Sequence, residues 1–278
     1  QQVSSAEFTP EGLWSNGFFD RNFMVLSEAN RMVTLRHEPT LALLKSSISE
    51  DGRCIIITAP EMPPLSVRFV DTAESDRPVI KFRMWGLDTE GLDCGHEAAT
   101  WLSTYLKKPG TKLVQFKQGL TKARRIVEDP SWGKRFTPKD NLNSFQDMGP
   151  VMLLTETSVD DLNSRLETPV TIRNLRPNFV VSGTPAYSKD KWKYVKIGDT
   201  LTMRKTHPCG RCKATAVDPE TGMARSDGEP IATLKQYRKV DKSNPDSKGL
   251  SGDPVFGALF VCEASGSVKV GDIVYAAV

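Results

Sequence analysis

The sequence predicts a mainly β protein of the α+β class, built from two β-rich halves and a connecting segment. Short β-type segments recur along the chain, few stretches have helical periodicity, and residues 118–150 are polar with little periodicity. A chain of 278 residues with 38% hydrophobic content can bury a core in one large or two ordinary domains. We expect a β domain over residues 1–120, a basic connection over 121–150 and a second β domain over 151–278.

The strands expected in the first half are short, alternating or β-branched, and bounded by Asn, Gly, Pro or Asp. They cover residues 23–26, 32–35, 54–58, 65–70 and 79–84. This spacing is typical of a barrel or sandwich.

One helix interrupts these strands. Asp93 is its expected N-cap, and Pro109-Gly110 is expected to end it. Its apolar residues recur at i, i+3, i+4, i+7 and i+8 and form one stripe. They are Ala98, Trp101, Leu102, Tyr105 and Leu106.

In the second half, a short helix is expected with Ser158 as N-cap and Asp161 completing a capping-box variant. A further helix over residues 229–238 opens with Pro at its first turn. Gly-Asp follows an apolar residue in both Lys196–Leu201 and Lys269–Val274, which suggests similar barrel hairpins. The expected strands are 151–154, 179–182, 194–197, 200–203, 212–217, 258–261 and 273–275.

Charge and composition exclude several classes of protein. The net charge of +3 is too small for nucleic-acid binding by bulk electrostatics. No apolar run of about 18 residues could span a bilayer, and the first residues lack the apolar region of a signal peptide. Five cysteines, an odd and low number, fit a reducing compartment better than a disulfide framework.

The segment Cys209-Gly-Arg-Cys212 carries the strongest chemical signal, and three uses of its thiols can be compared. A structural zinc ion needs four ligands. His207 lies near the pair, but His37 and His96 are far away in sequence and no second cysteine pair exists. The sequence therefore disfavours a closed zinc site.

A dithiol redox motif needs a helix N-terminus after the first cysteine, whereas this motif leads into an expected strand over residues 212–217. The third use is a single thiolate ligand to a soft metal, with the planar fork of Arg211 beside an anionic cofactor. A buried structural cysteine next to a surface arginine is the alternative.

The surroundings of this motif resemble the MOSC domain, and earlier segments resemble the N-terminal barrel that precedes it in the amidoxime reducing component family. The resemblance covers nearly the whole chain in matching order, and it implies two consecutive β-barrel domains. The matching segments are 32–39, 93–95, 161–165, 174–183, 209–212, 217–222 and 229–238.

This resemblance implies a molybdenum-molybdopterin cofactor with Cys212 as the protein ligand to the metal. Asp147 matches a carboxylate near the metal, and we expect a raised pKa that suits a proton donor. Cys209 is expected to be structural, with redox sensitivity as the alternative. The residues implied in cofactor binding are Arg21, Arg176, Asn178, Gly210, Arg211 and Cys212.

The chain also departs from the family pattern. A strand with a Lys-Ser pair for the cofactor precedes Arg21 in the family, and this sequence starts too late to contain it. Met148-Gly149 stands where relatives have Thr-Ser, and Leu259 stands where a relative has Tyr.

The implied function is reduction of N-hydroxylated compounds such as amidoximes and hydroxylamines. The alternatives are a sulfur-handling or non-catalytic MOSC protein similar to molybdenum cofactor sulfurase, and a structural subunit with a vestigial site. Segment 217–222 and the N-terminal barrel favour the reductase.

The implied electron donor is cytochrome b5 with its NADH-dependent reductase. The implied location is the mitochondrial outer membrane, facing the cytosol, through an anchor that this sequence does not contain. The connecting segment provides a candidate docking face, and a solvated basic loop is the alternative. Its basic residues are Lys117, Lys122, Arg124, Arg125, Lys134, Arg135 and Lys139.

Overall fold

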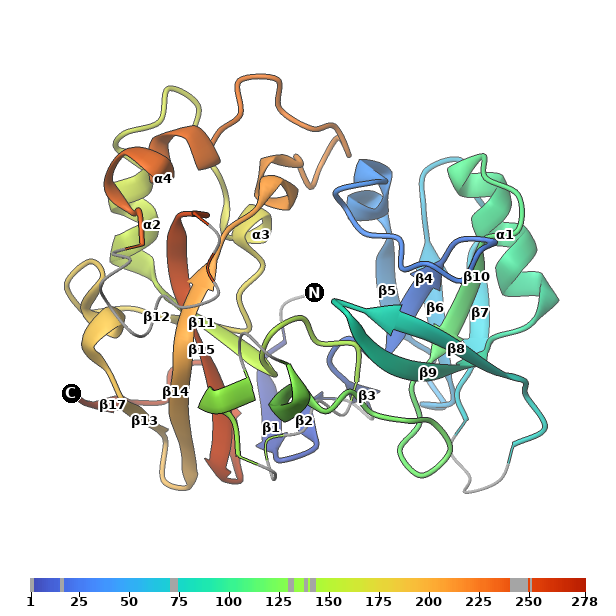
Figure 1. Ribbon diagram of the computed structural model, residues 1–278, viewed down its shortest axis with the longest axis horizontal. Helices are drawn as coiled ribbons and strands as arrows, with labels where there is room; N and C mark the ends of the chain where they lie inside the picture. The colour runs from blue at the N-terminus through green and yellow to red at the C-terminus, as the bar shows by residue number, and fades with distance from the viewer. Residues whose placement is uncertain are drawn as a thin grey trace.

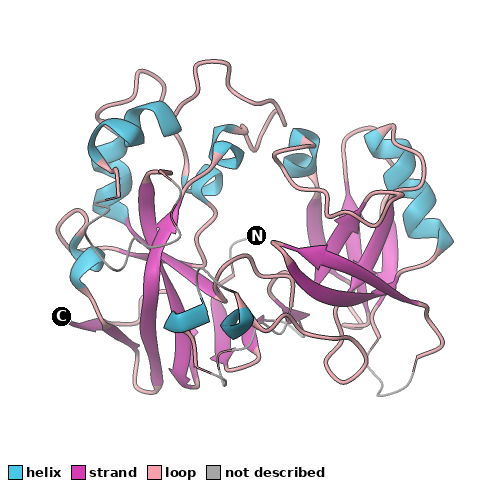
Figure 2. Cartoon of the chain, viewed as in Figure 1, coloured by secondary structure: helices cyan, strands magenta, loops and turns pink. Residues whose placement is uncertain are grey.

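The structure is a computed structural model that describes residues 3–15, 18–70, 75–129, 133–137, 140, 144–240, 250 and 252–278. Two β-rich lobes lie side by side, the second half of the chain at the left and most of the first half at the right (Figure 1). Strands form the centre of both lobes, and the helices lie around them (Figure 2). The mainly β prediction with a few helices is confirmed.

The left lobe is built on a curved six-stranded sheet in the order β12-β11-β15-β14-β13-β17. All neighbours are antiparallel except β11 and β12. Three register shifts between β14 and β15 bend this central pair. The strands are β11 (Val151–Thr155), β12 (Phe179–Val181), β13 (Tyr194–Ile197), β14 (Leu201–Gly210), β15 (Val255–Ala264) and β17 (Val274–Ala277).

The first residues of the chain join this lobe. Strand β1 (Ser5–Thr9) pairs with β16 (Gly266–Lys269) in a sheet of order β16-β1-β2-β3, which also holds β2 (Gly12–Ser15) and β3 (Phe18–Phe19). Phe8 is fully buried in the same apolar cluster as Val151 and Phe260. The two ends of the chain therefore share one core.

The right lobe contains two smaller sheets and one long helix. One sheet has the order β4-β10-β9-β8, and the other has the order β5-β6-β7. Helix α1 (His96–Leu106) packs its apolar stripe, with Leu102 fully buried, against Leu65 and Val67. The strands are β4 (Phe23–Leu26), β5 (Lys45–Ile48), β6 (Cys54–Thr58), β7 (Leu65–Arg68), β8 (Val79–Met84), β9 (Leu87–Asp93) and β10 (Lys112–Gln115).

Short helices connect these strands. The remaining α-helices are α2 (Glu156–Asn163), α3 (Ile172–Leu175) and α4 (Ile231–Tyr237). The 3-10 helices are η1 (Pro39–Leu43), η2 (Ile126–Glu128), η3 (Gly133–Arg135), η4 (Ser188–Lys191) and η5 (Lys213–Ala216).

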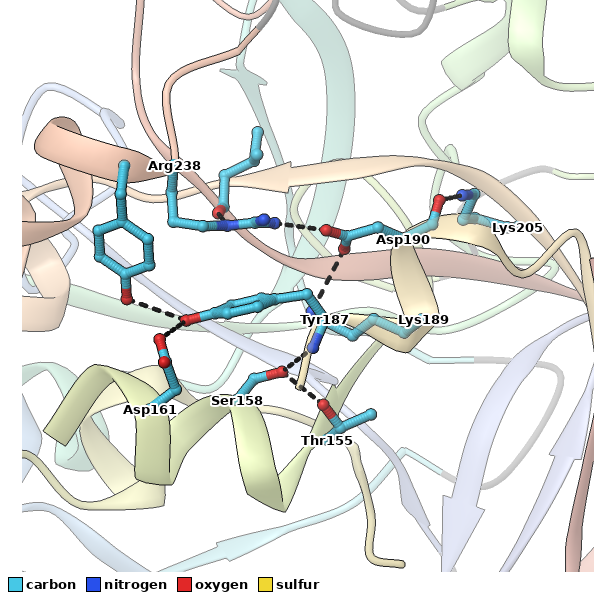
Figure 3. Close-up of polar contacts among 10 residues, drawn as sticks. Thr155, Ser158, Asp161, Tyr187, Lys189, Asp190, Lys205 and Arg238 are labelled. Atoms are coloured by element: carbon cyan, nitrogen blue, oxygen red, sulfur yellow. Dashed lines mark hydrogen bonds and ion pairs between the residues drawn. The ribbon is translucent and has the colours of Figure 1, made fainter. Parts of the chain in front are cut away.

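A polar network links α2, α4 and η4 (Figure 3). The Tyr187 hydroxyl donates to the Asp161 carboxylate at 2.6 Å and lies 2.9 Å from the Tyr237 hydroxyl. Arg238 bridges Asp190, at 2.6 Å, and the Val255 carbonyl at the start of β15. This network fixes the end of β15 that lies next to the Cys209–Cys212 motif.

Two helix starts differ from the predictions. The N-cap of α1 is Gly95, with φ of 94°, rather than Asp93, whose carboxylate accepts a hydrogen bond from the Gly95 N–H. Helix α2 starts at Glu156 with Thr155 as N-cap, and the Ser158 hydroxyl lies inside the helix, 2.5 Å from the Thr155 hydroxyl. In both cases a side chain near the helix start bonds to a neighbour instead of capping the first turn.

Two predicted strands were wrong. In segment 32–35 only Met32 forms an isolated bridge, because the N–H groups of His37 and Glu38 fold back onto the Thr34 carbonyl. Residues 213–216 form the 3-10 helix η5 rather than a strand. The backbone N–H and hydroxyl of Thr215 both donate to the Cys212 carbonyl, at 3.1 and 2.9 Å, which closes a turn.

Candidate functional site

Cys212 lies just beyond the end of the central strand β14. The N–H of Arg211 donates to the Pro254 carbonyl at 2.8 Å, which continues the contact with the β15 chain past Gly210. A Cβ at Gly210 would lie 2.8 Å from a terminal methyl carbon of Leu250, so a side chain here would have to displace that methyl group. Cys212 is then the N-cap of η5, half-buried and outside any disulfide. Its thiol therefore has access to a ligand.

The Arg211 side chain is buried and points away from solvent. Its guanidinium donates to the Leu175 carbonyl at 2.6 Å, the Met152 sulfur at 2.9 Å and the Cys209 sulfur at 3.2 Å. The buried Nε has no hydrogen-bond partner among the described residues. Arg211 thus places a positive charge behind the thiols and fixes the C-terminal end of α3.

Arg176 follows directly after α3 in the left-handed backbone region, with φ of 54°. A capping box of Thr171 and Asn174 fixes the other end of this short helix. Loss of surrounding water, together with the nearby charges of Arg21 and Arg211, lowers the pKa of the Arg176 guanidinium, and Asp20 opposes this shift. Its side chain keeps solvent-accessible surface and has no hydrogen-bond or ion-pair partner within the described part of the chain.

Arg21 lies in a second left-handed turn, with φ of 57°, between β3 and β4. Its guanidinium pairs with the Asp20 carboxylate, which accepts a hydrogen bond from the Asn178 amide at 2.9 Å. The other end of the Asn178 side chain accepts the Met152 N–H at 3.0 Å. Asn178 therefore connects the Arg21 turn to β11 and acts as a positioning residue.

Asp147 joins the site from the connecting segment, and its side chain is exposed. The buried Arg124 donates to the backbone carbonyls of Gln146 and Asp147, the latter at 2.7 Å. The Phe145 N–H donates to the Arg21 carbonyl at 3.0 Å. These contacts hold the Asp147 backbone beside the Arg21 turn.

The two thiols have different environments. Burial raises the pKa of the Cys209 thiol, and the adjacent Arg211 opposes that shift. The charges of Asp147 and Cys212 raise it further, so these groups lie close enough to interact. Cys209 therefore remains a protonated thiol at neutral pH.

Gly149 and Leu259, two of the residues that depart from the family pattern, lie next to each other in the structure. A Cβ at Gly149 would lie 3.2 Å from the Leu259 Cβ, so the small residue leaves room for the leucine. Both residues are buried, and the neighbouring Met148 packs against the same apolar cluster as Leu259. The space at this edge of the site is filled by apolar packing.

The predicted docking face needs a correction, because Arg124 is only 1% exposed and cannot contact a partner. Burial lowers the pKa of its guanidinium to about 10, against the opposing charges of Asp147 and Asp129. Lys122, Arg125 and Lys134 are exposed. Lys117 and Arg135 are half-buried, and Lys139 lies outside the described residues.

Sequence reasoning did not find the residues that position this site. Asp20, Arg124 and the Leu175 carbonyl act through contacts with distant parts of the chain. No local pattern marks these residues. No helix in the described part of the chain is long and apolar enough to cross a membrane.

Comparison with known proteins identifies the family to which this chain belongs. Residues 1–109 match the MOSC N-terminal beta barrel domain, and residues 140–275 match the MOSC domain. Mitochondrial amidoxime-reducing component 1 of Homo sapiens is 39% identical over 274 residues, which are 98% of this chain and 77% of that protein. Mitochondrial amidoxime reducing component 2 of Bos taurus is 41% identical over 275 residues, with the same coverage of both chains.

A solution structure of a protein from Bordetella bronchiseptica covers 34% of this chain and 71% of its own. With 18% sequence identity and a TM-score of 0.31, this match supports no inference about the present chain. The resemblance expected from the sequence motifs is confirmed by the two domain matches and the two relatives. This chain therefore belongs to the MOSC-domain family of mitochondrial amidoxime-reducing components.

Proposed function

We propose that this protein is a molybdenum cofactor-dependent reductase of N-hydroxylated compounds, such as amidoximes and hydroxylamines. The observation that carries the proposal is the convergence of a half-buried thiol, Cys212, with Arg21, Arg176 and Arg211 from three separate elements. The relatives named as amidoxime-reducing components support the same reaction class.

The charges of the site fit an anionic cofactor. Arg21 and Arg211 both lie within electrostatic reach of Arg176, and Asp20 is the carboxylate that opposes their effect on it. An anion among these groups would relieve their mutual repulsion. Arg176 has an accessible side chain without a partner in the described residues, so it has full capacity to bind a phosphate.

Each residue then has a defined role. Cys212 supplies the thiolate ligand, Arg21 and Arg176 hold the anionic part of the cofactor, and Gly210 leaves room for Leu250 beside the motif. Arg211 and Asn178 are positioning residues: Arg211 fixes the Leu175 carbonyl, and Asn178 fixes the Asp20 carboxylate. When bound, the cofactor supplies a redox-active metal centre that a soft thiolate ligand suits.

Reduction of an N–OH group to N–H consumes two electrons and two protons and releases water. Asp147 is the proposed source of protons, because its carboxyl is exposed to solvent and its backbone is fixed beside the Arg21 turn. Its role needs no proton path through the protein.

We further propose that cytochrome b5, supplied by its NADH-dependent reductase, delivers the electrons on the cytosolic face of the mitochondrial outer membrane. The relatives are named mitochondrial, which supports that compartment. The exposed cations Lys122, Arg125 and Lys134 suit a small, charge-steered encounter with an acidic donor.

Expression in a host that makes the cofactor tests this proposal through metal content and amidoxime reduction. We expect about one molybdenum per chain, lost in Cys212→Ala, because a thiolate ligand contributes directly to metal retention. Cys209→Ala is the matched control and should keep the metal, since burial keeps that thiol protonated. Metal-free wild-type protein from such a host would overturn the proposal, and a persulfide on Cys212 would indicate sulfur handling instead.

A further inference from the structure

Several of the most exposed apolar side chains in the described residues gather at one corner of the left lobe. This corner, called the β13–β17 corner below, consists of two adjacent strands and the 270–273 turn before β17. Its apolar residues and their exposed fractions are Tyr194 (45%), Val270 (71%), Ile273 (65%) and Tyr275 (58%). Exposed clusters of this kind mark interaction sites rather than ordinary surface.

The strand register places the two tyrosines of this corner on one face. Tyr275 is directly opposite Lys196, and Ala277 is opposite Tyr194. Residues two apart on a strand, and residues opposite each other across a pair, project on the same side of a sheet. Val195 and Ile197 of the same strand point into the core. Tyr194, Lys196 and Tyr275 therefore share the outer face.

Backbone hydrogen bonds fix the 270–273 turn. The N–H of Val270 donates to the Ser4 carbonyl at 2.9 Å, and that of Gly198 donates to the Ile273 carbonyl at 3.0 Å. The Asp272 carboxylate accepts the Lys269 N–H at 2.9 Å. The exposure of Val270 and Ile273 thus belongs to an ordered turn.

Exposed lysines surround these apolar groups. Lys193 and Lys196 lie on or next to β13, Lys191 ends η4 and Lys269 precedes Val270. Nearby acidic groups are fewer, because Asp190 is paired with Arg238, which leaves Glu7, Asp199 and Asp272. The corner therefore combines tyrosines and aliphatic tips with a net positive charge.

These properties favour a lipid surface over a protein partner. Lysine is depleted in protein–protein interfaces, and lysines near an edge strand such as β17 oppose pairing with a second copy. Tyrosine and lysine are instead suited to the headgroup region of an anionic membrane, where aliphatic tips reach the acyl boundary. Figure 1 shows β13 and β17 at the outer edge of the left lobe, on the far side of the sheet's centre from α3.

We propose that the β13–β17 corner is a peripheral membrane-contact site that seats on anionic phospholipid headgroups and inserts Val270 and Ile273. Contact through this corner leaves the Cys212 site open to the aqueous phase. The inference does not depend on the cofactor or on the proposed reaction. A failed reductase assay would therefore not contradict the membrane-contact proposal. Absent vesicle binding would likewise not contradict the proposed reductase function.

Cosedimentation of this chain with vesicles tests the proposal. The vesicles are phosphatidylcholine alone, or phosphatidylcholine with about one third phosphatidylserine. Each lysine near a charged membrane contributes a factor of roughly five to partitioning. We expect binding to the anionic vesicles only, and Lys196→Glu with Lys269→Glu should lower it more than tenfold. Val270→Ser with Ile273→Ser should lower it several-fold.

Matched controls separate the corner from general charge and hydrophobicity. Lys45→Glu with Lys81→Glu makes the same change in net charge at exposed positions of the right lobe. Val79→Ser with Met223→Ser removes apolar groups that are 44% and 67% exposed. Both controls should bind as the wild type does. Absent binding by the wild type, or equal losses in the controls, would overturn the proposal. So would a dimer in solution that Val270→Ser with Ile273→Ser converts to monomer.

Discussion

Asn178→Asp exchanges one NH₂ group for an oxygen in the contact that fixes Arg21. The Asn178 amide donates to the Asp20 carboxylate at 2.9 Å, while its oxygen accepts the Met152 N–H. The variant keeps the acceptor and brings two carboxylates to within about 3 Å of each other. Loss of a hydrogen bond to a charged group costs about 1.5–3 kcal/mol of unfolding free energy.

Repulsion between the two carboxylates adds to that cost. Asp20 is 31% exposed and Arg21 lies beside it, so solvent and the neighbouring charge reduce the repulsion to about 1–2 kcal/mol. The unfolding free energy of the variant should therefore be roughly 3–4 kcal/mol lower than that of the wild type at pH 7.5. The variant should also lose cofactor, because Arg21 is no longer fixed.

The loss should depend on pH in a defined direction. Crowding raises the pKa of the carboxyl pair in the folded state above that of an unfolded aspartate, so the protonated form favours folding. Stability is fully present below the unfolded pKa and is lost as the pH rises through the folded pKa. At pH 5 the protonated carboxyl introduced at position 178 can again donate to Asp20, and much of the deficit should disappear.

Urea unfolding followed by tryptophan fluorescence at pH 7.5 and pH 5 measures this effect, each time relative to wild type at the same pH. Asn178→Ala is the control, since it loses both hydrogen bonds without adding a charge. Its deficit should be about the same at both pH values. If the aspartate variant were as stable as wild type at pH 7.5, or had the same deficit at pH 5, the proposed connection to Asp20 would be wrong.

Two further predictions concern other parts of the chain. Gly222→Ala should destabilise the protein by a few kcal/mol in thermal unfolding, because its φ is 67° and a Cβ would lie 2.9 Å from Leu43 of the other lobe. Gly228→Ala is the control, because Gly228 has a φ of 76° and a Cβ there would have no atom within 4 Å. This variant should lose only the stability that the strained backbone costs. Equal losses of stability in the two variants would exclude the contact with Leu43. Burial lowers the pKa of His207 from 6.5 to about 3, so unfolding takes up a proton and stability should fall as the pH drops below 6.5. At pH 5 this loss should be about 2 kcal/mol in urea titrations, and His207→Gln should abolish that component.

The predictable part of the fold was the part encoded in local side-chain patterns. Segments 54–58, 79–84 and 194–197 are apolar or alternate, and each forms the expected strand. Strands β5 and β16 were missed because Lys-Ser-Ser-Ile and Gly-Ser-Val-Lys contain few apolar residues. The pairing of β1 with β16 joins the two ends of the chain, which no local window can indicate.

In the candidate site too, local sequence patterns did not indicate the contacts between distant parts of the chain. The motif placed Arg211 next to Cys212 from sequence alone, but it could not indicate that the Arg211 side chain turns inward to the Leu175 carbonyl. Arg124 was read as a surface cation because most arginines are exposed, whereas here it holds the Asp147 backbone. The misread strand after Cys212 has a related cause, since Ala-Thr-Ala-Val suits a strand by composition while Thr215 closes a turn.

Two kinds of arginine therefore form this site. Arg21 and Arg176 occupy left-handed backbone positions, with φ of 57° and 54°, that a non-glycine residue adopts only when its surroundings enforce it. Arg211 fixes the residue before Arg176, and Asn178 fixes the partner of Arg21, so each strained corner has its own support. The supports come from the residue directly after β14 and the residue directly before β12, two strands of one sheet. A ligand that bridges the two corners would therefore meet a backbone whose course is already set, and little of its binding energy would be spent on ordering that backbone.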